Sequence, residues 1–133
     1  MEISVKKLKL FSILLCIIFL LSFSLTVYAA EKPFTYNFRH ELTMNGHFKA
    51  KKSSATFSIH TTTNKSSSNY FTIKQFKYHP FNNNEYVTKK TIYCKKNSDG
   101  DCSFSTKKDT SYTYEFWKVE NGKYIVGSGT LKY

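Results

Sequence analysis

Polar and apolar residues alternate along much of the chain after residue 30. In the segment FTYNFRHELTM, the side chains at every second position from Phe34 to Met44 are apolar except for His40, and those between them are polar. A period of two residues is typical of a half-buried β-strand. The same pattern predicts further strands at HFKAKK, ATFSIHTT, NYFTIKQFKYH, EYVTKKTIYC, CSFST, SYTYEFWKV and KYIVGSGTLKY.

Turn-forming residues separate these strands. Asn45-Gly46 predicts a tight hairpin, and the other separators are SSSN, PFNNN, NSDGD, KKD and ENG. About eight short strands at even spacing predict an all-β fold, a small antiparallel β-sandwich of jelly-roll or immunoglobulin-like type. An eight-stranded barrel that holds a small ligand is the main alternative.

Two segments depart from regular alternation. In NYFTIKQFKYH the apolar positions change phase near Lys74-Gln75, which predicts a bulge there or an exposed aromatic pair. The sequence GSG at residues 127–129 lies inside a strand pattern and predicts a bend or bulge.

The first 29 residues have a different pattern. Three lysines precede the apolar run FSILLCIIFLLSFSLTV, and Val27 and Ala29 are the small residues of a signal-peptidase site. We therefore predict a signal peptide at residues 1–29 and a single domain at residues 30–133. The alternative is a retained membrane anchor, since a spanning helix needs about 20 apolar residues. Cleavage predicts a secreted protein, extracellular or associated with the cell wall.

The predicted domain contains two cysteines, Cys94 and Cys102, in the sequence CKKNSDGDC. Turn formers lie between them and strand patterns on either side, so we predict a disulfide across a hairpin in an oxidising compartment. A zinc site needs four ligands, and no second cysteine pair exists. Asn97, Asp99 and Asp101 alternate as in a calcium loop, but neighbouring lysines oppose a cation. We predict no metal and no cofactor.

Aromatic residues dominate the predicted core. Residues 30–133 contain nine Phe, nine Tyr and one Trp, against ten Leu, Ile, Val and Met. Large rings fill a small sandwich with few residues. Because Phe116 and Trp117 are adjacent in a strand, one of them points outward. An outward Trp117 would be a platform for sugar rings or lipid, although a covering loop is an alternative.

The predicted domain is basic. Three of the 20 basic residues and one of the nine acidic residues lie in residues 1–29, so residues 30–133 carry a net charge of about +9. Only Arg39 is an arginine, which predicts diffuse attraction to anions and no specific nucleic-acid recognition. Wall polymers and membrane surfaces are candidate partners. Lysines that protect sheet edges are the alternative explanation. The candidate anion-binding residues are Lys51, Lys52, Lys89, Lys90, Lys95, Lys96, Lys107, Lys108 and Trp117.

No catalytic motif is found. The four histidines match no metal-binding pattern, and no serine lies in a nucleophile elbow. His40 is expected at the edge of the core or buried in it, and His60 is expected to point outward. A basic ribonuclease is the one enzyme class that the composition leaves open, with His47 and Glu41 as an acid–base pair across the first hairpin.

These patterns favour a small secreted non-enzymatic β-domain that associates with anionic polymers of the cell envelope. A cationic bacteriocin-like antagonist and a secreted basic hydrolase are the alternatives. In type, but not in any motif, the chain resembles small secreted β-proteins of bacteria. The sequence does not predict the oligomeric state or the identity of the ligand.

Overall fold

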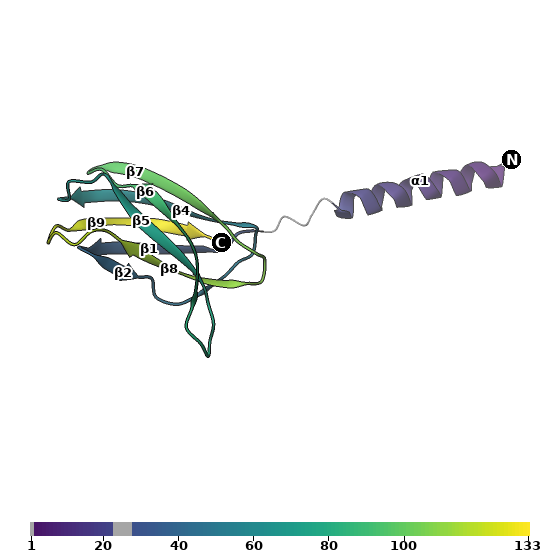
Figure 1. Cartoon of the computed structure of the whole chain (residues 1–133). Coiled ribbons are helices and arrows are strands. Elements are labelled where there is room, and N and C mark those ends of the chain that lie inside the picture. Colours follow the sequence, from purple (N-terminus) through teal and green to yellow (C-terminus); the bar gives the residue numbers. More distant parts are fainter. Residues whose placement is uncertain (1, 23–27) are drawn as a thin grey trace.

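The computed structural model describes residues 2–22 and 28–133 of the chain. Helix α1 spans Glu2–Ser22, and the β-strands follow between Glu31 and Lys132 (Figure 1). Val27, part of the predicted cleavage site, lies outside the described residues. Within the described residues, no helix is both long enough and apolar enough to cross a membrane.

Two antiparallel sheets pack together as a small β-sandwich, which confirms the predicted fold class. Sheet A has the strand order β1-β9-β4-β7. Sheet B has the order β2-β8-β5-β6, and β3 also pairs with β8. The strands are β1 (Glu31–Phe38), β2 (Glu41–Thr43), β3 (Phe48–Lys49), β4 (Ser54–Asn64), β5 (Tyr70–Lys77), β6 (Glu85–Tyr93), β7 (Ser98–Ser105), β8 (Ser111–Trp117) and β9 (Ile125–Lys132).

The strand order is that of a jelly roll. Both β2 and β3 pair with β8, so together they act as one interrupted strand. The pairing is nested: β1 pairs with β9, β2 and β3 with β8, β4 with β7, and β5 with β6. Nested antiparallel pairing that folds over into two sheets distinguishes the jelly roll from other sandwiches. Of the two predicted sandwich types, the chain therefore adopts the jelly roll.

The predicted strand over residues 34–44 is divided between the two sheets. β1 ends at Phe38 in sheet A, and after a two-residue bend β2 begins at Glu41 in sheet B. The alternation continues across this corner because both sheets direct their inner side chains into one core. A pattern of polar and apolar positions cannot reveal such a bend.

The hairpin predicted at Asn45-Gly46 is wrong. β2 pairs with residues 115–117 of β8, and β3 pairs with residues 111–112 of the same strand. Both segments therefore run in the same direction along β8, and Asn45-Gly46 interrupts them without reversing the chain. Gly46 has a φ of +86°, a left-handed conformation that glycine adopts without steric cost.

The predicted Cys94–Cys102 disulfide is also wrong, and both thiols are free. β6 and β7 belong to different sheets and meet where Gly100 lies against the Tyr93 carbonyl. Cys94 follows Tyr93 toward the connecting turn, whereas Cys102 follows Gly100 away from the turn. With Tyr93 opposite Gly100, Cys94 lies opposite Asp99, about three residues from Cys102, which corresponds to ~10 Å along a strand. A disulfide requires Cα atoms within about 7 Å.

Cys94 is fully buried and Cys102 is partly buried, and burial makes both thiols less acidic. It raises the pKa of Cys94 and of Cys102 to about 11, and at Cys102 nearby Lys90 opposes the shift while Asp101 adds to it. At pH 8 only about one thiol in a thousand would be ionised. In a Cys16→Ser variant, we expect Ellman's reagent at pH 8 to label neither thiol until denaturant is added. Rapid labelling of the native protein would contradict the described burial.

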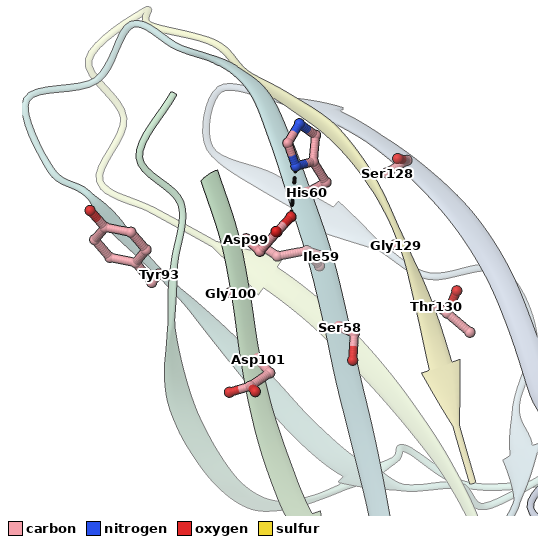
Figure 2. A pocket seen from close by; sticks show the side chains of 10 residues that line it. All are labelled: Ser58, Ile59, His60, Tyr93, Asp99, Gly100, Asp101, Ser128, Gly129 and Thr130. Atoms are coloured by element: carbon pink, nitrogen blue, oxygen red, sulfur yellow. Dashed lines mark hydrogen bonds and ion pairs between the residues drawn. The ribbon is translucent and has the colours of Figure 1, made fainter. Parts of the chain in front are cut away.

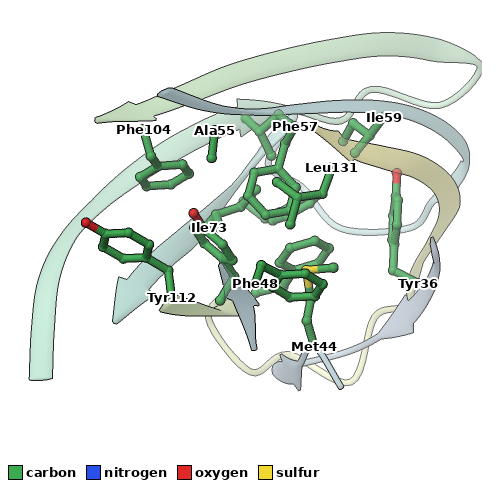
Figure 3. Packing of buried hydrophobic residues seen from close by; sticks show 14 of the residues in the cluster. Tyr36, Met44, Phe48, Ala55, Phe57, Ile59, Ile73, Phe104, Tyr112 and Leu131 are labelled. Atoms are coloured by element: carbon green, nitrogen blue, oxygen red, sulfur yellow. The ribbon is translucent and has the colours of Figure 1, made fainter. Parts of the chain in front are cut away.

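Phe116 of β8 lies at the centre of the core. It is fully buried, and its ring centroid lies between 5.1 and 6.1 Å from those of Phe34, Tyr36, Phe38, Phe57 and Phe71. Most of these rings meet edge to face or tilted, the geometry that aromatic quadrupoles favour. Figure 3 shows the labelled core rings directed inward from both sheets. The aromatic residues therefore fill the core as the composition predicts.

Two glycines in β9 make room for rings of β1. Gly127 pairs with Tyr36, and Gly129 pairs with Phe34. A Cβ atom on Gly127 would lie 2.3 Å from the Tyr36 hydroxyl oxygen, and one on Gly129 would lie 2.8 Å from the Phe34 ring. β9 continues through both glycines, and the register shift opposite them is in β4, between Thr61 and Thr63. The predicted irregularity is therefore in the partner strand.

Candidate functional site

β8 places Phe116 in the core and Trp117 on the outer face of sheet B. Trp117 is half-buried, and the Nζ of Lys74 on neighbouring β5 lies 5.3 Å from the centroid of its ring. The same Nζ is 3.4 Å from a carboxylate oxygen of Glu115. Lys74 is thus held between an aromatic face and a carboxylate, an arrangement that contributes cation–π attraction and fixes the lysine beside the indole.

A groove of about 490 Å³ lies beside Trp117. Its lining includes residues 66–68 before β5, Tyr70 and Thr72 on the strand, and the loop after β8. A second hollow of about 580 Å³ is lined by Thr72, Thr91, Lys89 and Lys90. Because Thr72 and Thr91 line both hollows, the two hollows join into one open depression across β5 and β6. We call this depression the sheet-B groove; it has aromatic side chains at one end and the Lys89 side chain at the other.

A buried lysine holds the loop that forms one wall of the sheet-B groove. The Nζ of Lys118 donates hydrogen bonds to the Arg39 carbonyl at 2.7 Å, the Val119 carbonyl at 2.9 Å and the Asn121 side-chain oxygen at 2.9 Å. Burial lowers the pKa of Lys118, while the Glu120 carboxylate raises it. The three acceptors satisfy the ammonium inside the protein and order the loop from residue 118 to residue 121.

The predicted lysine pairs do not share one face. Lys51 and Lys52 lie before β4, next to Lys107 and Lys108 after β7, because the Thr106 hydroxyl donates to the Lys52 carbonyl at 2.7 Å. Lys95 and Lys96 lie in the turn between β6 and β7, whose Asn97 N–H donates to the carbonyl of Thr61 far along β4. Of the four pairs, only Lys89 and Lys90 line the groove, and they point to opposite sides of β6. Lys89 is cross-strand from Lys74 on the outer face, whereas the Nζ of Lys90 lies 6.0 Å from the centroid of the Phe104 ring in sheet A.

Further aromatic residues lie on the outer face of sheet B. Phe76 is cross-strand from Tyr86 with centroids 5.8 Å apart, and the register of β5 with β6 shifts between Gln75 and Phe76. β5 itself keeps its alternation, with Gln75 buried and Phe76 outward, and the extra residue at the register shift is Val87 of β6. The phase change in the sequence therefore reflects an outward aromatic side chain, and the predicted bulge lies in the partner strand. Phe81, in the extended connection from β5 to β6, is 95% exposed (Figure 1).

The histidines do not assemble the predicted acid–base pair. His47 stacks on Tyr78 with ring centroids 4.1 Å apart, whereas the Glu41 carboxylate lies 3.6 Å from His40. His40 is half-buried at the corner between β1 and β2, and His60 points outward, both as the sequence predicts. Among the described residues, no three His, Cys, Asp or Glu side chains form a group that could hold a metal.

The outer face of sheet A has a hollow of about 680 Å³ that no sequence pattern predicts. Figure 2 shows His60 of β4 bonded to Asp99 of β7, and the Nδ1–Oδ1 distance is 2.7 Å. Ser58, Ser128 and Asp101 also line this hollow. The available signal was the run of small polar residues at alternate positions of three strands, but only the strand pairing brings them together.

The fold and these surfaces define a small jelly-roll domain with open, polar and aromatic depressions on both outer faces. A scan against models of known protein families finds no match to this chain, and a search of curated proteins finds none.

Proposed function

We propose that this protein is a secreted, non-enzymatic domain that binds anionic polysaccharides of the cell envelope through the sheet-B groove. The observation that carries the proposal is the continuity of the groove, in which Trp117 and Tyr70 lie at one end and the Lys89 side chain at the other. A ligand in this groove would meet a flat apolar surface and a positive charge a short distance apart.

The chemistry of the groove suits a sugar chain that carries negative charges. An indole and a phenol ring present large, rigid apolar surfaces against which a sugar ring can pack. Thr72 and Thr91, between the rings and the lysines, supply hydroxyl groups that both donate and accept hydrogen bonds. Lysine ammonium groups attract an anionic substituent without requiring one fixed geometry.

The charge of the whole domain supports a polymer as the ligand. Residues 30–133 carry a net charge of about +9, and the lysine pairs are spread over both ends of the sandwich and one sheet edge. Such a field attracts an extended polyanion from many directions and speeds its encounter with the groove. The predominance of lysine over arginine fits many weak contacts better than one specific phosphate site.

We expect Trp117→Ala to weaken binding to an anionic polysaccharide about tenfold or more, because large aromatic side chains contribute strongly to binding energies. The measurement is isothermal titration of the protein with hyaluronan, whose charged and uncharged sugars alternate, and sedimentation with purified cell wall. Phe81→Ala is the matched control, since it also truncates an exposed aromatic side chain but lies outside the groove.

The salt dependence of binding and the choice of ligand both test this proposal. Binding should weaken at least tenfold as salt rises from about 0.05 M to 0.5 M, because exposed charges are screened over a Debye length. Salt-insensitive binding, or an unchanged affinity in Trp117→Ala, would remove the proposal. Preferential binding to anionic lipid vesicles would instead favour a membrane surface as the partner, and inhibition of a bacterial culture would favour the antagonist.

A further inference from the structure

The hollow on the outer face of sheet A lies on the opposite side of the sandwich from the sheet-B groove. Three strands build it, because the pairing aligns Ser128 of β9, His60 of β4 and Asp99 of β7 in one cross-strand row. The adjacent row contains Thr130, Ser58 and Asp101. Alternate residues of a strand share a face, so all six side chains project from the same side of sheet A.

The side chains around this hollow are hydrogen-bonding groups that suit hydroxyl-bearing ligands. The hydroxyls of Ser58, Ser128 and Thr130 can donate and accept, and the carboxylate of Asp101 can only accept. The imidazole of His60 uses Nδ1 for Asp99, which leaves Nε2 directed away from that bond (Figure 2). An anionic substituent would be repelled by the two aspartates, whereas an uncharged sugar presents several hydroxyl donors to them.

Two tyrosines connect the hollow to the groove around one edge of the sandwich. Tyr70 lines the sheet-B groove, and Tyr93 lines the hollow of sheet A. Their rings are cross-strand neighbours, with centroids 5.3 Å apart and planes 64° apart. This aromatic pair gives a sugar chain a surface to pack on as it passes from one sheet to the other.

Gly100 makes this edge possible. A Cβ atom at Gly100 would stand 2.1 Å from the carbonyl oxygen of Tyr93, so only glycine lets the end of β6 lie against β7. The close approach brings Tyr93 beside Asp99 and Asp101, which flank Gly100 in sequence. The continuity of groove, tyrosine pair and hollow therefore depends on a specific backbone contact.

We propose that the hollow lined by Ser58, His60, Asp101 and Tyr93 is a second subsite for the same polysaccharide ligand. The polysaccharide chain crosses the β6–β7 edge from the sheet-B groove, and the hollow binds the hydroxyl groups of an uncharged sugar in that chain. This inference rests on the proposed function. It assigns the ligand a composition in which anionic residues meet Lys89 and uncharged residues meet the aspartates.

The order Ser128, His60, Asp99 also resembles a nucleophile, a base and the group that orients it. Within the described residues, however, the only hydrogen bond recorded among these three side chains joins His60 to Asp99. The His60 side chain is 50% exposed and that of Asp99 86% exposed, so water reaches the pair freely. A binding role requires only the donors and acceptors that are present, and it is the role that the geometry supports.

The test compares a short and a long ligand. We expect the purified protein to bind a hyaluronan oligosaccharide of about sixteen residues at least fivefold more tightly than the tetrasaccharide, since only the long chain reaches both subsites. Asp101→Ala should remove most of that difference and leave the affinity for the tetrasaccharide unchanged or slightly raised. Asp101→Asn, which keeps an acceptor, should restore part of it, and Tyr93→Phe should bind more tightly than Tyr93→Ala.

Net charge alone predicts the opposite change in affinity for the Asp101→Ala variant. Removal of a negative charge from the protein should strengthen its attraction to a polyanion, so a weakened affinity in Asp101→Ala cannot arise from net charge. Glu31→Ala is the matched control, because it removes a carboxylate on the same outer face but outside the hollow. It should leave the affinity for the long chain unchanged or slightly raised.

The outcomes distinguish the two proposals. Equal affinities for both lengths, or tighter binding of the long chain by Asp101→Ala, would overturn the second subsite while the sheet-B groove stands on the response to Trp117→Ala. Failure of the wild-type protein to bind either length would overturn both proposals.

Discussion

The Phe116→Ala variant is expected to have a free energy of unfolding about 4 kcal/mol lower than the wild type. Phe116 is fully buried and packs against rings from β1, β4 and β5, so truncation leaves a cavity between the two sheets. The rings around it are large and constrained by the sheets, and they can collapse only partly into the space. Urea denaturation followed by intrinsic fluorescence measures the loss.

Phe81→Ala is the control for this prediction. The Phe81 side chain is 95% exposed, so its truncation should change the free energy of unfolding by no more than about 0.5 kcal/mol. If the two variants lost similar small amounts, the central position of Phe116 in the core would be wrong. Soluble but unfolded Phe116→Ala protein would agree with the prediction, because the domain is small.

Gly100→Ala is expected to lower the free energy of unfolding by about 3 kcal/mol, at the upper end for overpacked positions. The added methyl group would stand 2.1 Å from the carbonyl oxygen of Tyr93, and a backbone atom cannot rotate away. Relief requires β6 and β7 to separate at the edge of the sandwich. The variant should therefore also expose Tyr93, which the near-ultraviolet circular dichroism would report.

Gly122→Ala separates this steric effect from backbone strain. Gly122 has a φ of +70° and nothing within 4 Å of a Cβ position, so its replacement costs only the left-handed conformation, about 1 kcal/mol. If Gly100→Ala cost no more than Gly122→Ala, the close contact between β6 and β7 would be absent from the folded protein.

The alternation of polar and apolar residues predicted the fold class because it reports burial directly. Phe57 and Ile59 of β4, and Tyr114 and Phe116 of β8, point into the core as their spacing requires. Burial does not report which sheet a strand joins, since inner faces of both sheets meet the same core. The alternation of polar and apolar residues therefore could not predict the bend after Phe38 or the jelly-roll pairing of the strands.

The difference between the predicted and the observed structure of residues 94–102 has a specific cause. The sequence pattern predicts a turn that includes both Asn97 and Gly100, but only Asn97 has a turn conformation, with a φ of +56°. Gly100 belongs to β7, where the absence of a side chain permits contact with β6. A glycine needed for close approach and a glycine needed for a turn are identical in sequence, and this ambiguity produced the incorrect disulfide.

The candidate sites differ in how far the sequence could predict them. The sequence predicted that either Phe116 or Trp117 points outward, because adjacent residues of a strand face opposite sides, and the structure shows that it is Trp117. The lysine pairs were predicted as a group, but the structure distributes them over loops that the sequence could not place. The hollow of sheet A combines residues from β4, β7 and β9, whose register only the folded chain determines.

The pairing of β1 with β9 has a consequence for the order of events in the cell. The outermost of the nested strand pairs joins the first strand to the last, so the sandwich cannot close until the polypeptide has been synthesised at least to residue 132. Folds dominated by such distant pairings also form slowly. For a chain that is exported by means of an N-terminal signal peptide, as proposed above, this topology would prolong the time during which the export channel encounters an unfolded chain and not a folded domain.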